Sequence, residues 1–203
     1  MTGGLDQALA AVFGIDARVI LIDPGIAFRT RSAKGEGRSP QRHYPCMPIG
    51  ELMQLPVAKI AAPDCFLFLW VPLRSVFLVE PFMEAWGFAY SGSAFAWAKL
   101  NKRGADRPIT DPKAWFFGNG YGTRHNAEIC WLGRRGHPKR LSKGVRELIV
   151  APVREHSRKP DEVYSRIEAM SAGPYVELFA RQQWPGWISV GNEINKFQAA
   201  RSA

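Results

Sequence analysis

Short apolar runs recur along the chain, and polar or glycine-containing segments separate them. Residues 18–23 form a β-branched run that ends on an acid followed by Pro24, which is typical of a buried strand in a parallel sheet. Residues 65–71 have the same character. The same reasoning predicts further strands at residues 93–99, 127–132, 147–151, 175–179 and 187–190.

Helical spacing appears between several of these runs. Residues 48–55 fit a short helix, and residues 75–86 fit a crossover helix that ends at Gly87. Another helix begins at Pro160, because proline and acids favour the first turn of a helix. Strands that alternate with helices predict a single α/β domain over residues 1–203, with an ordered core from about 15 to 195 and a mostly parallel sheet.

The carboxyl ends of the strands indicate where a ligand would bind. Ligands of open α/β sheets bind outside these ends, and Asp23 lies at one of them. Residues 101–126 form a long polar loop of the kind that is often functional or disordered. Its glycine-rich stretch, residues 118–122, lacks the preceding strand and following helix that a phosphate-binding loop requires. A plain loop is therefore the better interpretation.

Composition narrows the class of protein. A chain of 203 residues with 46% apolar residues can bury one core. No apolar stretch is long enough to span a bilayer, and the first residues lack the basic cluster of a secretion signal. The cysteines, Cys46, Cys65 and Cys130, are scattered and odd in number, which favours thiols in a reducing cytoplasm over disulfides or a zinc site.

The formal net charge of +9 suits a polyanionic partner. Much of this charge lies in two runs of basic residues. The first contains a single acid, Glu36, among Arg29, Arg31, Lys34, Arg38 and Arg42, and the second has no acid among Arg134, Arg135, His137, Lys139, Arg140 and Lys143. Such loops suit phosphate contacts, so nucleic acid is favoured over a membrane, although a solvated basic surface remains the alternative. Without further information the sequence indicates a basic α/β domain with a cleft near Asp23.

A series of blocks in a fixed order extends this interpretation. They stand at residues 22–28 (Ile-Asp-Pro-Gly-Ile-Ala-Phe), 43–47, 68–71, 97–101, 156–164, 177–181, 186–187 and 191–193. From Ile20 to Glu193 the chain resembles the family founded on the seventy-kilodalton subunit of messenger-RNA adenosine methyltransferase, and especially its short bacterial and phage DNA members. The resemblance implies an S-adenosylmethionine-dependent methyltransferase of adenine N6 in nucleic acid, with DNA favoured over RNA. It also implies a Rossmann-like fold that is circularly permuted, with helices on both faces of the sheet.

The resemblance also assigns cofactor contacts. Lys159 matches a family position that binds the cofactor carboxylate, and Arg181, Asn192 and Glu193 match positions that serve the ribose and nearby polar atoms. Each has a plainer alternative. Lys159 could be a surface residue before a helix, and Arg181 an ordinary ion-pair partner.

Asp23 stands where the family has its catalytic acid. The adenine amino group is a poor nucleophile, because its lone pair is delocalised into the ring. If the Asp23 carboxylate and the Pro24 carbonyl accept its two N–H bonds, the lone pair is localised toward the methyl donor, and positioning supplies most of the acceleration. No metal or histidine base is needed.

The motif departs from the family pattern of Asp-Pro-Pro-Trp at Gly25 and Ile26. Three outcomes stay open: a slower enzyme, an enzyme with another target such as the cytosine amino group, or a degenerate nucleic-acid-binding module. Restoring proline and tryptophan would raise methylation if the motif is merely weakened. The remaining predicted contacts with the nucleic acid are the aromatic residues Phe28, Tyr44 and Tyr121 and the basic residues Arg29, Arg31, Arg38, Lys139 and Arg140.

Overall fold

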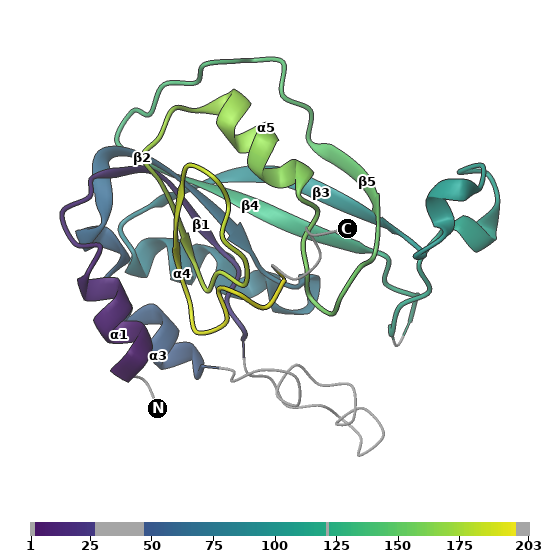
Figure 1. Cartoon of the computed structure of the whole chain (residues 1–203), viewed down its shortest axis with the longest axis horizontal. Coiled ribbons are helices and arrows are strands. Elements are labelled where there is room, and N and C mark those ends of the chain that lie inside the picture. The colour runs from purple at the N-terminus through teal and green to yellow at the C-terminus, as the bar shows by residue number, and fades with distance from the viewer. Residues whose placement is uncertain (1–2, 27–46, 121, 198–203) are drawn as a thin grey trace.

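In the part of the chain that the structure describes, seven strands form one sheet that has helices on both faces (Figure 1). The computed structural model describes residues 3–26, 47–120 and 122–197. The strands are β1 (Ala17–Ile22), β2 (Ala61–Trp70), β3 (Ala89–Leu100), β4 (Ala127–Arg135), β5 (Leu148–Pro152), β6 (Tyr175–Leu178) and β7 (Trp187–Val190). All seven strands predicted from the apolar runs are confirmed, with ends that differ by a few residues.

The helices are short. They are α1 (Gly3–Ala10), α3 (Ile49–Met53), α4 (Val79–Ala85) and α5 (Glu162–Met170), with 3-10 turns η2 (Val57–Lys59), η3 (Leu73–Leu78), η4 (Gly104–Asp106) and η5 (Pro112–Ala114). The helix predicted over residues 75–86 is only partly correct, because the α-helix begins at Val79 and η3 precedes it. This start places Pro81 in the first turn of α4, where its missing N–H leaves no intrahelical hydrogen bond unmade. The sequence pattern did not predict α1.

The strand order β5-β3-β4-β2-β1-β6-β7 confirms a mostly parallel sheet. Only β4 opposes its neighbours β2 and β3, while β1 pairs in parallel with β2 on one side and β6 on the other. The first strand of the chain therefore lies in the middle of the sheet next to a late strand. This order agrees with the permuted methyltransferase fold that the resemblance implies.

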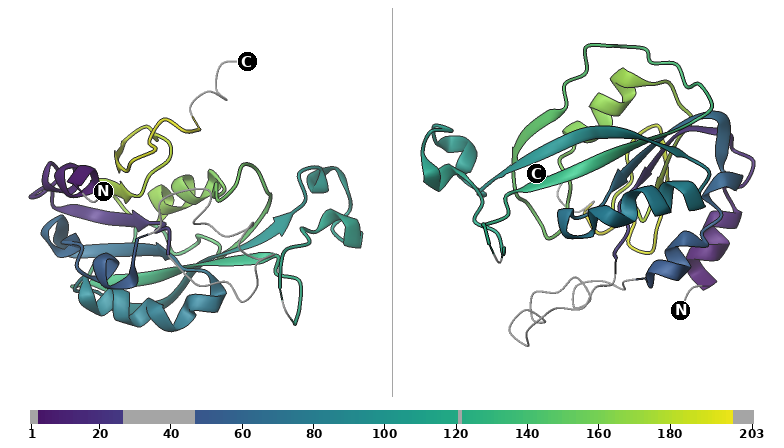
Figure 2. Two further views of the ribbon diagram at one scale, coloured as in Figure 1. Left: turned by 90° about the horizontal axis from the view of Figure 1, so that it is seen from below. Right: turned by 180° about the vertical axis from the view of Figure 1, so that it is seen from behind.

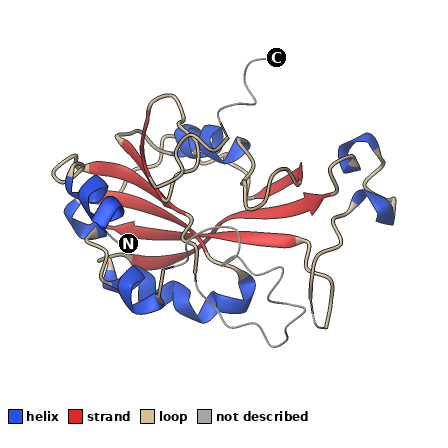
Figure 3. Cartoon of the chain, turned by 60° about the horizontal axis from the view of Figure 1, so that its bottom comes forward, coloured by secondary structure: helices blue, strands red, loops and turns tan. Residues whose placement is uncertain are grey.

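Each face of the sheet has its own apolar core. Successive residues of β1 serve both: Ile20 and Ile22 pack in the cluster that contains α3 and α4, whereas Val19 and Leu21 pack in the cluster that contains α5. Both faces of β1 are covered, which explains why its sequence is continuously apolar from Val19 to Ile22 rather than alternating. Figures 2 and 3 show the resulting three layers, with the strands between α4 and α5.

The segment between β3 and β4 extends away from the body of the domain (Figure 2). Apart from η4 and η5 it is loop, as the sequence predicts. Its glycine-rich part folds back on itself, because a Cβ at Gly120 would lie 1.7 Å from the Thr123 carbonyl oxygen. A Cβ at Gly118 would lie similarly close to the His125 carbonyl oxygen, so these two glycines have a structural reason that needs no phosphate.

Within the described ranges, no helix is both long and apolar enough to cross a bilayer. Cys65 and Cys130 are buried free thiols in the sheet, and Cys46 lies outside the described residues.

Candidate active site

An ion pair joins two segments that lie far apart in the chain. Asp23 follows β1 directly, and Lys159 lies shortly before α5. The Lys159 Nζ donates to the Asp23 Oδ2 over 2.7 Å. Both side chains are only partly exposed, at 26% for Asp23 and 15% for Lys159. The structure thus brings together the residue predicted to act on the substrate and one predicted to bind the cofactor.

Arg154 fixes the backbone that carries Lys159. Its Nη2 donates to the Lys159 carbonyl over 2.6 Å, and its two terminal nitrogens bind the Asp161 carboxylate over 2.8 and 2.9 Å. Burial alone would raise the pKa of Asp161, but hydrogen bonds from Arg154 and Gln182 outweigh it and lower that pKa. Asp161 is therefore a stable anion at neutral pH that holds this segment in place.

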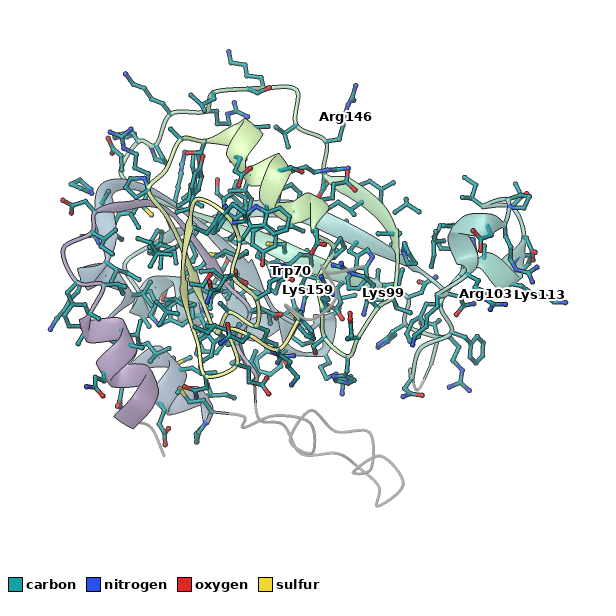
Figure 4. All side chains as sticks on the ribbon, in the orientation of Figure 1. Trp70, Lys99, Arg103, Lys113, Arg146 and Lys159 are labelled. Carbon is teal, nitrogen blue, oxygen red and sulfur yellow. The ribbon has the colours of Figure 1, made fainter. Side chains whose placement is uncertain are left out.

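A second carboxylate supports Lys159 from the sheet. Glu128 on β4 lies 3.4 Å from the Lys159 Nζ and also accepts a hydrogen bond from Lys99 on β3. Burial opposes the charge of Glu128, yet the two lysines outweigh burial and lower its pKa to about 2. Positive and negative side chains thus alternate in a row across the edge of the sheet, in the order Lys99, Glu128, Lys159 and Asp23. Figure 4 shows Lys159 and Trp70 near the centre of the molecule, with Lys99 toward the extended segment.

A pocket opens beside this row on the α5 face of the sheet. Its wall combines charged groups with aromatic rings: Asp23, Arg158, Lys159, Glu177 and Arg181 with Trp70, Tyr164, Phe179 and Phe197, and further with Leu21, Ser157, Val163 and Gln182. The Lys159 Nζ lies 5.3 Å from the centroid of the Trp70 ring. Among the described residues, the buried Trp70 indole N–H has no acceptor, so it is a donor that a polar ligand could use.

The most buried acid of the pocket wall is Glu177 on β6. Both of its carboxylate oxygens lie within 3.1 Å of the Tyr164 hydroxyl. Burial raises the pKa of Glu177 to about 8, the negative charge of Asp23 adds to this, and Tyr164 and Lys159 oppose it. The raised pKa makes Glu177 the pocket acid whose charge changes near neutral pH.

The other predicted cofactor residues are distributed unevenly. Arg181 lines the pocket, and its Nε lies 3.6 Å from the Glu193 carboxylate. Glu193 also pairs with Lys196 over 2.6 Å. Asn192 is exposed and is not part of the pocket wall. The structure thus brings Lys159 and Arg181 together around one cavity, with Glu193 behind Arg181.

The residues after Asp23 turn away from the pocket. Pro24 is buried, and the Gly25 carbonyl accepts a hydrogen bond from the Met47 amide over 3.0 Å. Ile26 is 3% exposed and packs in the cluster on the opposite face of the sheet, with α3 and α4. In this structure the position where the family has its tryptophan is a core position.

Most of the predicted substrate contacts lie outside the described residues. This holds for the aromatic residues Phe28, Tyr44 and Tyr121 and for the basic residues Arg29, Arg31 and Arg38. Lys139 and Arg140 are described, and both are exposed on the segment between β4 and β5. Arg140 lines a separate groove that Arg134, His137 and Lys143 also line.

Sequence reasoning missed the role of Glu128, Lys99 and Glu177. A usable signal existed for the two acids, because each interrupts an otherwise apolar strand, where a charge needs a partner. Their partners come from β3, from the segment before α5 and from α5 itself, which spacing along the chain does not reveal. Within the described part of the chain, no group of three or more His, Cys, Asp or Glu side chains could hold a metal ion.

Comparison with known proteins supplies a family. The sequence model described as MT-A70 matches residues 17–193. The chain is 34% identical over 157 residues to N(6)-adenosine-methyltransferase subunit METTL3 of Danio rerio and 33% identical over 157 residues to the METTL3 catalytic subunit of Homo sapiens. Each alignment covers 73% of this chain and 26% of the relative.

A shorter relative is also similar. The Type II methyltransferase M.MunI of Mycoplasma sp is 32% identical over 154 residues, which cover 74% of this chain and 60% of that protein. The chain therefore spans about a quarter of the length of the METTL3 proteins and three fifths of the length of the bacterial enzyme.

Proposed function

The chain belongs to the MT-A70 family, and from this premise we infer that it transfers a methyl group to the exocyclic amino group of adenine in DNA. Methyltransferases of this family use S-adenosylmethionine. The observation that carries the proposal is the ion pair of Asp23 and Lys159 at the edge of a pocket whose chemistry suits this cofactor.

The pocket residues match the parts of S-adenosylmethionine. The cofactor has a carboxylate, an ammonium, a ribose and an adenine ring. Lys159 and Arg181 supply positive charge for the carboxylate and polar groups, and the rings of Trp70, Tyr164 and Phe179 supply aromatic surface. The Trp70 indole N–H adds a donor that has no acceptor among the described residues. The donor set therefore fits the cofactor.

Asp23 acts on the substrate. A carboxylate accepts several hydrogen bonds, so the bond from Lys159 to Oδ2 leaves capacity for an adenine N–H. The bound cofactor supplies an electrophilic methyl group. Asp23 and the Pro24 carbonyl would orient the amino lone pair toward it, and Lys159 would hold the Asp23 carboxylate in position. The target base must be unstacked first, which costs about a few kcal/mol in a duplex.

DNA is proposed as the polymer because the chain resembles the short members of the family. Its match covers a much larger share of the Mycoplasma Type II methyltransferase than of the METTL3 proteins. The test is a competition in which equal amounts of unmethylated DNA and RNA receive labelled methyl groups in one reaction, and the nucleosides are analysed separately. Label in N6-methyladenine from DNA is expected. Label in RNA alone would contradict the proposal that DNA is the substrate. Label in cytosine would contradict the proposal that adenine is the methylated base.

The altered motif favours one rival function, a nucleic-acid-binding module that has lost catalysis. Gly25 and Ile26 replace the proline and tryptophan of the family pattern, so no aromatic platform follows Asp23 directly. An aromatic contact contributes about 1–3 kcal/mol per base, so its loss is serious unless another ring replaces it. Protein that binds S-adenosylmethionine and DNA but transfers no methyl group would support this rival.

Restoring the family tryptophan is expected to destabilise the protein. Ile26 is 3% exposed in the core beside α3, so Ile26→Trp overfills a packed site and should lower the free energy of unfolding by about 1–3 kcal/mol. Thermal denaturation measures this, with Ile26→Leu as the control of similar volume. A variant that keeps its stability and methylates faster would instead mean that the tryptophan reaches the substrate.

Affinity for DNA is expected to fall steeply with salt, because the net charge of +9 includes the exposed cations Lys139 and Arg140. Replacing both by glutamine should reduce the slope of log K against log salt by about 0.9 for each phosphate contact that is lost. Fluorescence anisotropy at several salt concentrations gives the slope, and Lys59→Gln, outside both basic runs, is the control. An unchanged slope in the double variant would remove these two residues from the interface.

A further inference from the structure

Glu177 is a buried acid with an unusual environment. Its side chain points from β6 toward α5 and lines the same pocket as Lys159. The residue is 7% exposed, and its two oxygens share a single hydroxyl, that of Tyr164, at 3.1 and 3.0 Å. Lys159 and Arg181 of the same pocket form ion pairs with other acids, Asp23 and Glu193. Burying the charge of a carboxylate is costly, so the position of Glu177 suits a neutral acid or an incoming positive charge.

The charged groups that face Glu177 come from several elements. Asp23 at the end of β1 disfavours its negative charge, and Lys159 before α5 favours it. From α5 itself comes the Tyr164 hydroxyl, which also receives a long hydrogen bond of 3.4 Å from Gln182. Arg158 and Arg181 belong to the same pocket wall, and each is paired with acids outside it, such as Glu155 and Glu193. The cations of the pocket are thus largely balanced without Glu177.

These surroundings leave the charge of Glu177 to be set by the ligand. Burial and, to a smaller extent, the charge of Asp23 raise the pKa of Glu177 to about 8. Glu177 is therefore largely protonated at neutral pH. A neutral carboxyl can also donate a proton to the Tyr164 oxygen, which makes this state compatible with the observed contact. A cation placed in the pocket would favour ionisation, because an opposite charge within a few ångströms lowers the pKa of a carboxyl.

The two forms of the cofactor differ in this respect. S-adenosylmethionine carries a sulfonium charge in addition to its ammonium and carboxylate, whereas S-adenosylhomocysteine lacks the sulfonium charge. The pocket therefore has to hold a net cation before methyl transfer and a net neutral molecule after it. A titratable buried acid in its wall responds to this difference.

On the basis of the proposed function, we propose that Glu177 is the counter-charge of the sulfonium and gives the pocket its preference for S-adenosylmethionine over S-adenosylhomocysteine. Glu177 holds a proton in the pocket without cofactor and releases it to solvent when S-adenosylmethionine binds. It takes a proton back when the neutral product occupies the pocket. Charge and protons balance: one cation enters and one proton leaves to solvent. Methyl transfer then turns the sulfonium into a neutral thioether, the adenine amino group gives up one proton, and Glu177 takes up one proton, which restores the neutral state.

Isothermal titration calorimetry of both ligands from pH 6 to 9 tests this, in pairs of buffers with different ionisation enthalpies. We expect S-adenosylmethionine to bind with release of a proton at neutral pH and to bind tighter with rising pH, by close to tenfold per pH unit, up to about pH 8. Affinity for S-adenosylhomocysteine should change much less. In Glu177→Gln the proton release should disappear, and the preference for S-adenosylmethionine should fall by about tenfold or more.

Matched variants separate this role from structure. Glu162→Gln removes an exposed acid of α5 that pairs with Arg166 outside the pocket, and it should leave both affinities unchanged. Tyr164→Phe removes the hydroxyl that lowers the pKa of Glu177, so the pH profile for S-adenosylmethionine should move to higher pH without being lost. Titration of the ligand amino group persists in every variant, so the difference from the unmodified protein isolates Glu177.

The outcomes are distinguishable. If both ligands bind with the same pH profile and the same proton release, the assignment of Glu177 is overturned while the proposed function stands. A Glu177→Gln variant that folds and keeps the pH profile has the same meaning. If the unmodified protein binds neither ligand at any pH, the proposed function fails and this inference fails with it.

Discussion

Asp23→Asn is expected to reduce methyl transfer by about 100- to 1000-fold, the usual cost of removing one preorganised group that stabilises a transition state. The amide keeps the shape of the side chain but loses the negative charge that localises the amino lone pair. S-adenosylmethionine affinity should change far less, because Lys159 loses a competing acceptor rather than its charge. Single-turnover transfer and calorimetry on the same protein measure the two effects separately.

The matched control for this prediction is Asp106→Asn, which removes an exposed carboxylate from η4 in the extended segment. It should transfer methyl groups at the unmodified rate. Full transfer by Asp23→Asn would mean that the carboxylate serves only as an ion-pair partner of Lys159, and the proposed role in catalysis would be abandoned.

Lys159→Met is expected to weaken S-adenosylmethionine binding by about 10- to 100-fold, since a hydrogen bond between charged groups contributes about 1.5–3 kcal/mol. Methionine keeps most of the apolar stem of the lysine, so the change isolates the ammonium, which lies 5.3 Å from the centroid of the Trp70 ring. The variant should also melt at a lower temperature, because Asp23 loses its ion pair with Lys159, and Glu128 keeps Lys99 as its one cation among the described residues. The exposed cation Lys139, changed to methionine, is the control.

Calorimetry and thermal denaturation together distinguish a cofactor-binding role of Lys159 from a structural one. Lys159→Arg should bind S-adenosylmethionine better than the methionine variant, because it keeps the charge. If cofactor affinity is unchanged in Lys159→Met while stability falls, the lysine would be a structural partner of Asp23 and Glu128 rather than a cofactor residue.

The sequence predicted the framework of the site because its signals are local. An apolar run that ends in Asp23 indicates a buried strand and the edge where it stops, and Pro160 with the acids after it indicates the start of α5. The end of this strand and the start of this helix together predict the approximate position of the active site. The resemblance gave Asp23 and Lys159 their roles, but only the structure shows the Lys159 Nζ 2.7 Å from the Asp23 Oδ2, because no spacing along the chain encodes contact between residues so far apart.

Other features depend on the sheet and were beyond local patterns. Glu128 acquires its role because β4 lies between β2 and β3, which aligns it with lysines from two other segments. Ile26 faces the core because the chain turns after Asp23 and bridges to Met47. Comparison of sequences alone therefore does not reveal that this motif position is part of the core.

Methyl transfer by the purified chain is the measurement that tests the proposed function most directly. Protein, labelled S-adenosylmethionine and unmethylated DNA would be incubated, and the nucleosides would be analysed by mass spectrometry beside Asp23→Asn. The proposed function predicts N6-methyladenine whose formation depends on the Asp23 carboxylate. No transfer to adenine from protein that binds the cofactor and DNA would contradict it and leave a nucleic-acid-binding module in its place.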